Sequence, residues 1–200
     1  MTHHVRARAR VVSLALNPAV LTGVFFVILA WQFEPTTTAA LWASGIAVTF
    51  VTVMPIASLF ALVALGKLTD VEMRIRSERD VVYGVCLVSY VVGTVLLIVI
   101  GASWQVWGFM ALHVPNTIIM SLLNRRWKVS IHAATIAGVC AAALVFFGSA
   151  AAPALLLLPI AAWGRWAAGA HSKTELITGA AFGMISAPAG IAFLRFLVGG

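Results

Sequence analysis

Charge is scarce in this sequence. Only 10% of the 200 residues are Asp, Glu, Lys or Arg, whereas 62% are hydrophobic and the mean hydropathy is +1.04. A soluble domain has roughly 25% charged and 45–50% apolar residues. The composition therefore excludes an ordinary soluble domain and indicates an integral membrane protein in contact with a lipid bilayer.

Acidic residues are especially few. Six Asp and Glu stand against 13 Lys and Arg, which gives a net charge of +7. A basic balance of this kind also occurs in nucleic-acid-binding proteins, but no basic stripe alternates here with aromatic residues on a polar surface. We expect no nucleic-acid partner, because the cations lie between hydrophobic runs.

Cysteine, repeats and linkers are also rare or missing. The two cysteines, Cys86 and Cys140, lie inside apolar runs without metal-ligand spacing, which predicts a packing role. No internal repeat or low-complexity linker divides the chain, so we expect one domain over residues 1–200. The basic start MTHHVRARAR precedes an apolar run of spanning length, which predicts a retained first helix instead of a cleaved signal peptide.

Long hydrophobic runs dominate the rest of the sequence. A helix needs about 20 mostly apolar residues to cross about 30 Å of hydrocarbon. Stretches of this kind occupy residues 11–31, 39–66, 82–102, 105–123, 130–148, 151–170 and 175–197. They predict an all-α fold, a polytopic transmembrane helix bundle with seven spans.

The charged residues gather on one side of this predicted bundle. With seven alternating crossings, twelve of the 13 Lys and Arg fall on the side of the N-terminus, and Arg195 falls on the other. The connections of that other side hold one charge, Glu34. The positive-inside rule then predicts that the charged side faces the cytoplasm, in the cell (inner) membrane.

Three polar clusters on the charged side hold candidate site residues. The first, GKLTDVEMRIRSERD at 66–80, is typical of a solvated loop with compensating charges, or of part of an anion site. The second, KVSIHAA at 128–134, places Ser130 and His132 where a span begins, and a helix N-terminus favours an anion. As alternatives, Ser130 could act only as a helix N-cap, and His132 could bond a backbone carbonyl at the membrane interface.

The third cluster is GRWAAGAHSKTE at 164–175. Here Arg165 lies six residues before His171, and Glu175 lies four residues after that histidine. Side chains four residues apart face each other on a helix, so a carboxylate at this position can bond one ring nitrogen of the histidine and leave the other free to react.

Together the clusters favour an anion over a metal. Two histidines and a carboxylate could bind a metal ion, but the surrounding excess of lysine and arginine would repel a cation. Arginine presents paired donors that suit phosphate, and lysine adds a mobile charge. Phosphoryl transfer needs such donors around its equatorial oxygens, and two histidines can supply a nucleophile and an acid–base group.

The motifs in these clusters resemble those of the type 2 phosphatidic acid phosphatase superfamily, membrane lipid phosphatases related to vanadium haloperoxidases. The first family motif is lysine, six residues, arginine and proline; KLTDVEMR has Lys67 and Arg74 at this spacing, followed by Ile75. The second is proline, serine, glycine and histidine, of which VSIH keeps Ser130 and His132.

The third family motif is serine, arginine, five residues, histidine, three residues and aspartate. GRWAAGAHSKTE keeps both spacings, with Gly164 in place of the serine and Glu175 in place of the aspartate. The order of the motifs also agrees, and the resemblance covers residues 66–175.

The resemblance implies a six-helix phosphatase core and a role for each matched residue. His171 would be the nucleophile that forms a phosphohistidine, Glu175 would orient it, and His132 would be the general acid. The phosphate would be bound by Lys67, Arg74, Ser130 and Arg165, with Arg79 or Arg76 as alternatives for the arginine of the first motif. The family needs no metal and no cofactor.

The expected function is metal-independent hydrolysis of a membrane lipid phosphate or diphosphate. An isoprenoid diphosphate is favoured, because the chain has little extramembrane mass to recognise an elaborate headgroup; phosphatidic acid or phosphatidylglycerol phosphate is the second candidate. A transferase would use the same residues. Other classes remain open: a non-catalytic lipid-phosphate binder, or an anion transporter with the cations as a selectivity ring. The oligomeric state, a homo-oligomer included, is also open.

Overall fold

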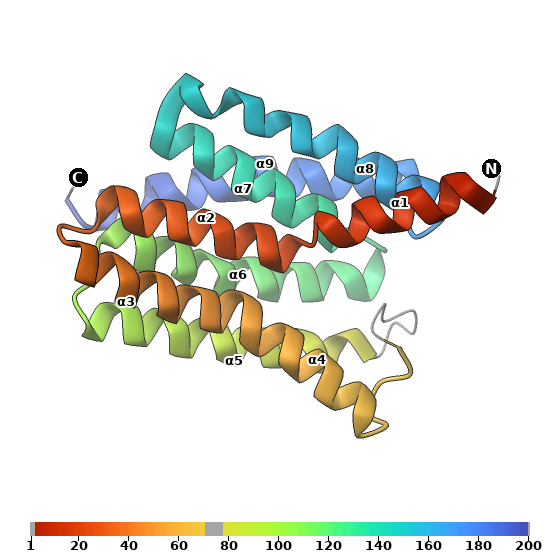
Figure 1. Ribbon diagram of the computed structural model, residues 1–200, viewed down its shortest axis with the longest axis horizontal. Coiled ribbons are helices and arrows are strands. Elements are labelled where there is room, and N and C mark those ends of the chain that lie inside the picture. The colour runs from red at the N-terminus through yellow and green to blue at the C-terminus, as the bar shows by residue number, and fades with distance from the viewer. Residues whose placement is uncertain (1–2, 71–77, 200) are drawn as a thin grey trace. The chain divides into compact units, whose positions relative to one another are not determined.

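The chain folds into helices. The computed structural model describes residues 3–70 and 78–199, and this part of the chain contains helices and no strand (Figure 1). Six of its helical stretches are long and apolar enough to cross a membrane: Ala7–Phe33, Thr37–Ala64, Glu78–Val99, Trp104–Arg126, Ile131–Ala167 and Lys173–Leu197. The predicted all-α polytopic bundle is confirmed. The lengths and the apolarity of its helices are those of an integral membrane protein.

The sequence predicted seven spans, and the difference from six lies in residues 131–167. This stretch contains three consecutive elements, α7 (Ile131–Phe147), the 3₁₀ segment η2 (Gly148–Leu156) and α8 (Leu157–Ala167). Gly148 has a φ of 63°, which glycine adopts at little cost, and the chain reverses here so that α7 and α8 are antiparallel (Figure 1). The Cys140 thiol donates to the carbonyl oxygen of Ala154 at 3.1 Å. The predicted fifth and sixth spans are therefore two arms of one continuous helical stretch.

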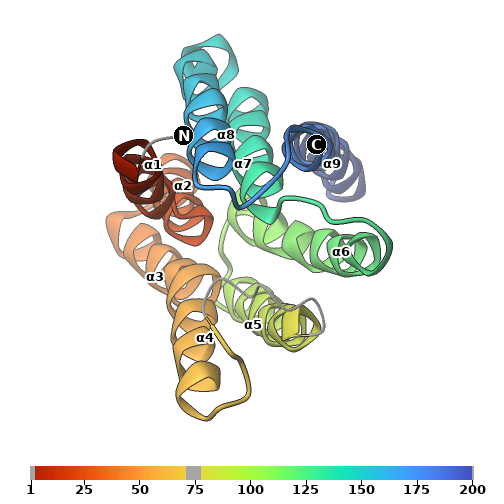
Figure 2. The ribbon, with the colours of Figure 1, turned by 90° about the vertical axis from the view of Figure 1, so that its right-hand side faces the viewer.

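The chain divides into two compact units, and each is described by itself. The first unit comprises residues 1–21 and 128–200, and the second comprises residues 22–127. The first unit contains α7, η2 and α8 together with α1 (His3–Ala15) and α9 (Lys173–Leu197). Figure 2 looks onto the end of this unit where α8 ends and the chain passes to α9.

Glycine allows α7 and α9 to pack closely. A Cβ atom at Gly183 would collide with the carbonyl oxygen of Ala134, and a Cβ atom at Gly179 would collide with that of Ser130. Small residues let the backbones of membrane helices approach each other. The contact at Ser130 and Gly179 brings the beginnings of α7 and α9 together, and the candidate site lies at this end.

The second unit is built around apolar side chains. Except for the first turn of α2, it contains α2 (Pro18–Phe33), α3 (Thr37–Val48), the π-helical segment η1 (Thr49–Val53), α4 (Met54–Ala64), α5 (Glu78–Val99) and α6 (Trp104–Arg126). The largest fully buried hydrophobic side chains of this unit are Phe26, Leu29, Leu97, Met110, Val51 and Val106.

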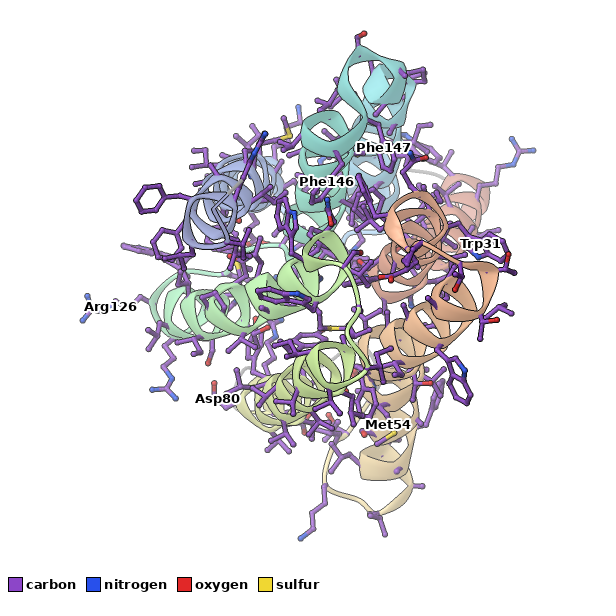
Figure 3. All side chains as sticks on the ribbon, turned by 90° about the vertical axis from the view of Figure 1, so that its left-hand side faces the viewer. Trp31, Met54, Asp80, Arg126, Phe146 and Phe147 are labelled. Atoms are coloured by element: carbon purple, nitrogen blue, oxygen red, sulfur yellow. The ribbon has the colours of Figure 1, made fainter. Side chains whose placement is uncertain are left out.

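The two ends of α6 differ in charge. At its beginning, the Glu34 carboxylate accepts hydrogen bonds from the backbone N–H and the hydroxyl of Ser103, both at 2.8 Å. A carboxylate is favourable there, because the N–H groups of a first helical turn lack helical partners. At its end, Arg125 Nε lies 3.8 Å from Asp80 Oδ2, and Arg126 projects away from the helix (Figure 3). Glu34 is thus a helix cap, and the cations lie at the opposite end of α6.

Candidate anion site

The second and third sequence motifs meet at one end of the first unit. Ser130 precedes α7, Arg165 lies in the last turn of α8, and Glu175 lies in the first turn of α9. The backbone N–H of Ser130 donates to the carbonyl oxygen of Glu175 at 3.1 Å. Residues 128–134 and 164–175, separate in the sequence, are therefore in direct contact.

Ser130 is the N-cap of α7. Its buried hydroxyl oxygen accepts from the backbone N–H of Ala133 at 3.4 Å. Ser172 caps α9 in the same way, because its hydroxyl oxygen accepts from the N–H of Glu175 at 3.3 Å. The capping role considered for Ser130 is therefore present, and its side chain is fully buried.

His171 and Glu175 form the closest side-chain pair of the site. His171 Nδ1 lies 2.7 Å from Glu175 Oε2, and the histidine side chain is only 8% exposed. The contact arises because His171 immediately precedes the cap of α9 while Glu175 lies in the first turn of that helix. When the ionised carboxylate accepts the Nδ1 proton, the lone pair of the ring is on Nε2.

Lys128 belongs to the same cluster, although its distance in the sequence from Glu175 did not predict a contact between them. Its ammonium group lies 3.6 Å from Glu175 Oε2 and donates to the carbonyl oxygen of Ala170 at 3.4 Å. In the sequence Lys128 is one of several loop cations next to the second motif. Its contact with the third motif depends on the packing of α7 against α9, and no local pattern could have revealed it.

Arg165 is hydrogen-bonded to the first helix and lies near both histidines. Its Nη1 donates to the hydroxyl oxygen of Ser13 at 3.2 Å, and its charge acts on both His132 and His171. His132 and His171 also interact electrostatically with each other. The structure therefore brings together five predicted site residues, namely Ser130, His132, Arg165, His171 and Glu175.

The environment holds His171 neutral. Burial lowers the pKa of its imidazole below the ordinary value of 6.5, and the cations Arg165 and Lys128 act in the same direction. The hydrogen bond to Glu175 raises the pKa, but the net shift is downward. At neutral pH the ring is therefore in its unprotonated form, which is the form that can attack an electrophile.

The first sequence motif lies in the second unit or outside the described residues. Arg74, with its alternative Arg76, falls in residues 71–77, which the structure does not describe. Lys67 is exposed after α4, and Arg79 lies in the first turn of α5 with its Nη1 3.4 Å from Asn124 Oδ1. The phosphate-binding roles of Lys67, Arg74 and Arg79 stay predictions from the motif.

The chemistry of the cluster suits an anion. Within residues 3–70 and 78–199, no group of three or more His, Cys, Asp or Glu side chains could hold a metal ion. The cluster instead offers a guanidinium, an ammonium and a serine hydroxyl as donors around two imidazoles. Comparisons with protein-family models, with curated proteins and with solved structures give no match to this chain.

Proposed function

We propose that this chain is a membrane-embedded phosphatase that hydrolyses a lipid phosphate or diphosphate through a phosphohistidine. The observation that carries the proposal is the pair of His171 Nδ1 and Glu175 Oε2, 2.7 Å apart beside Arg165 and Lys128. A neutral imidazole oriented by a carboxylate is a nucleophile, and the cations beside it attract the phosphate it would attack. A transporter would need the cations but not the oriented histidine.

In the first step, the Nε2 lone pair of His171 attacks phosphorus. A phosphorus–nitrogen bond forms, the bond between phosphorus and the bridging oxygen breaks, and its electron pair goes to the leaving lipid oxygen. Protonated His132 donates a proton to this oxygen.

In the second step, water replaces the histidine. Neutral His132 takes a proton from the water, whose oxygen attacks phosphorus while the phosphorus–nitrogen bond breaks. The electron pair returns to Nε2 of His171, inorganic phosphate leaves, and His132 is again protonated. Throughout, Glu175 keeps the Nδ1 proton in place, and Arg165 and Ser130 donate to the phosphate oxygens.

The motif order supports the same function. The resemblance to the type 2 phosphatidic acid phosphatase superfamily assigns these roles to His171, His132 and Glu175, and it adds Lys67 with Arg74 or Arg79 as further phosphate ligands. We favour an isoprenoid diphosphate as the substrate, and place the reaction on the cytoplasmic face of the cell membrane. Phosphatidic acid and phosphatidylglycerol phosphate are the other lipid phosphates to compare.

The test is phosphate release by the full chain, purified in detergent, from farnesyl diphosphate and from phosphatidic acid with a metal chelator present. We expect chelator-resistant release by the wild type and none above background by His171→Ala. His132→Ala should lower kcat by about 10²–10⁴-fold, the usual contribution of a general acid–base group. His4→Ala, a histidine outside the three motifs, is the matched control and should keep the wild-type rate.

Each contrary outcome removes a different part of the proposal. Release that survives His171→Ala excludes the phosphohistidine mechanism. No release from any of the lipid phosphates by a folded sample contradicts the phosphatase assignment and favours a non-catalytic lipid-phosphate binder.

A further inference from the structure

The guanidinium of Arg165 is tied to the first helix of the chain. Its Nη1 donates to the hydroxyl oxygen of Ser13 at 3.2 Å, across 152 residues of sequence. Ser13 is buried, with 9% of its surface exposed, in the face of α1 that packs against α8. Ser13 lies outside all three sequence motifs.

Gly164 allows this approach. A Cβ atom there would lie 3.3 Å from the carbonyl oxygen of Ala9 and 3.5 Å from the backbone nitrogen of Ser13. The first distance is shorter than most Cβ contacts, so a larger residue at this position would require α1 or α8 to shift by a few tenths of an ångström. Gly164 is also the position at which the sequence departs from the serine of the third family motif.

We infer that Ser13 is a positioning residue for Arg165. Gly164 allows α1 to approach α8 closely enough for the Ser13 hydroxyl to reach the guanidinium of Arg165. The inference rests on the proposed function, because it concerns the phosphate that Arg165 would bind. This gives the departure from the family motif a structural role. Gly164 has no hydroxyl of its own, but its small size lets the hydroxyl of Ser13 on α1 approach Arg165.

The physical reason is the freedom of an arginine side chain at a helix end. Arg165 lies in the last turn of α8, where its long side chain has many rotamers, and each one lost on binding an anion weakens that binding. A hydrogen bond from Nη1 to a buried hydroxyl selects one orientation in advance. A guanidinium held in one orientation loses less conformational freedom when it binds a phosphate.

The experiment measures phosphate affinity and turnover separately in the full-length protein. Binding of inorganic phosphate is followed by calorimetry, and kcat and KM are measured with farnesyl diphosphate. Ser13→Ala should weaken phosphate binding and raise KM by about tenfold, the size expected for one hydrogen bond to a charged group, with a smaller effect on kcat. Leu14→Ala, at an exposed neighbour on α1, should leave both unchanged.

Two further variants separate positioning from general destabilisation of α1. Gly164→Ala should weaken phosphate binding as Ser13→Ala does, because it displaces the helix that carries the hydroxyl. In an Arg165→Met background, Ser13→Ala should cause no further loss, because the hydroxyl acts only through the arginine.

The outcomes distinguish this inference from the proposed function. Unchanged phosphate affinity in Ser13→Ala, an equal loss in the Arg165→Met background, or a wild-type chain that binds no phosphate overturns the role of Ser13. Phosphate binding that weakens in Ser13→Ala, in a wild-type protein that hydrolyses none of the lipids, supports the positioning role while it contradicts the phosphatase.

Discussion

One oxygen of Glu175 serves two neighbours. Oε2 lies 2.7 Å from His171 Nδ1 and 3.6 Å from the ammonium group of Lys128. The lysine is half-exposed, so its ion pair contributes little to stability. Its charge also acts on the histidine, because burial and the cations Arg165 and Lys128 lower the pKa of His171 and favour the neutral, nucleophilic ring.

This arrangement predicts a specific pH profile. The acid limb of kcat/KM should lie below pH 6.5, the ordinary pKa of histidine, because the net shift of His171 is downward and protonation removes the nucleophile. Lys128→Gln should move this limb to higher pH, since it removes a cation that lowers the pKa, and Lys128→Arg should leave it in place. A purely structural lysine would change the rate without moving the limb, and an unmoved limb in Lys128→Gln would contradict the assignment.

The same shift affects folding. A histidine with a lowered pKa in the folded state binds fewer protons there than in the unfolded chain. Stability therefore falls as the pH drops below about 6.5, where only the unfolded state takes up the proton.

At the scale of helices, α7 and α9 form the frame of the site. The backbone approach at Gly179 and Gly183 sets where the beginnings of both helices lie. Because Ser130 and Glu175 belong to these beginnings, a change in the separation of α7 and α9 changes the site even when it occurs several turns away.

Gly183→Ala should test this coupling. The added Cβ would collide with the carbonyl oxygen of Ala134 and lie 2.7 Å from the backbone nitrogen of Gly138. We expect destabilisation by about 1–3 kcal/mol, the usual cost of overpacking, together with a loss of activity. Thermal unfolding in detergent gives the first quantity and phosphate release the second. Gly84→Ala on α5, where a Cβ meets no atom within 4 Å, is the control, and equal behaviour of the two variants would contradict tight α7–α9 packing.

The sequence predicted those features that depend on neighbouring residues. Hydropathy located the spans to within a few residues, because the bilayer imposes a minimum apolar length on each helix. The spacing of four residues predicted the contact of His171 with Glu175. The place of Ser130 before an apolar run predicted that it caps α7.

Other features depend on packing between distant segments. Lys128 reaches Glu175, and Ser13 reaches Arg165, only through helix pairs that no spacing rule identifies. The sequence also did not predict that residues 148–156, which include the start of the predicted sixth span, form a 3₁₀ segment between α7 and α8.

For the molecule as a whole, the distribution of charge predicts the orientation. In the second unit, Arg125 and Arg126 lie at one end of α6, while Glu34 lies at the other as a helix cap. In the first unit, Lys128, Arg165 and Lys173 lie at the end that carries the candidate site. Cations of this density next to spans favour the cytoplasmic side.

Cysteine accessibility can measure that orientation. In a chain without Cys86 and Cys140, an Arg126→Cys variant should resist an impermeant thiol reagent applied to intact cells and react after the membrane is opened. Thr38→Cys, exposed near the opposite end of the second unit, should react from outside. The reverse pattern would place the charged end of α6 on the outer face and contradict the cytoplasmic orientation.

The first unit joins segments that are far apart in the sequence, and this order has a consequence for biosynthesis. Helix α1 and the residues that follow it pack against α7 and α8, which the ribosome makes only after residues 22–127. During the synthesis of residues 22–127, α1 therefore lacks its partners in the first unit. A nascent chain interrupted before α8 has the hydroxyl of Ser13 but neither Arg165 nor His171, so the proposed site can assemble only late in translation.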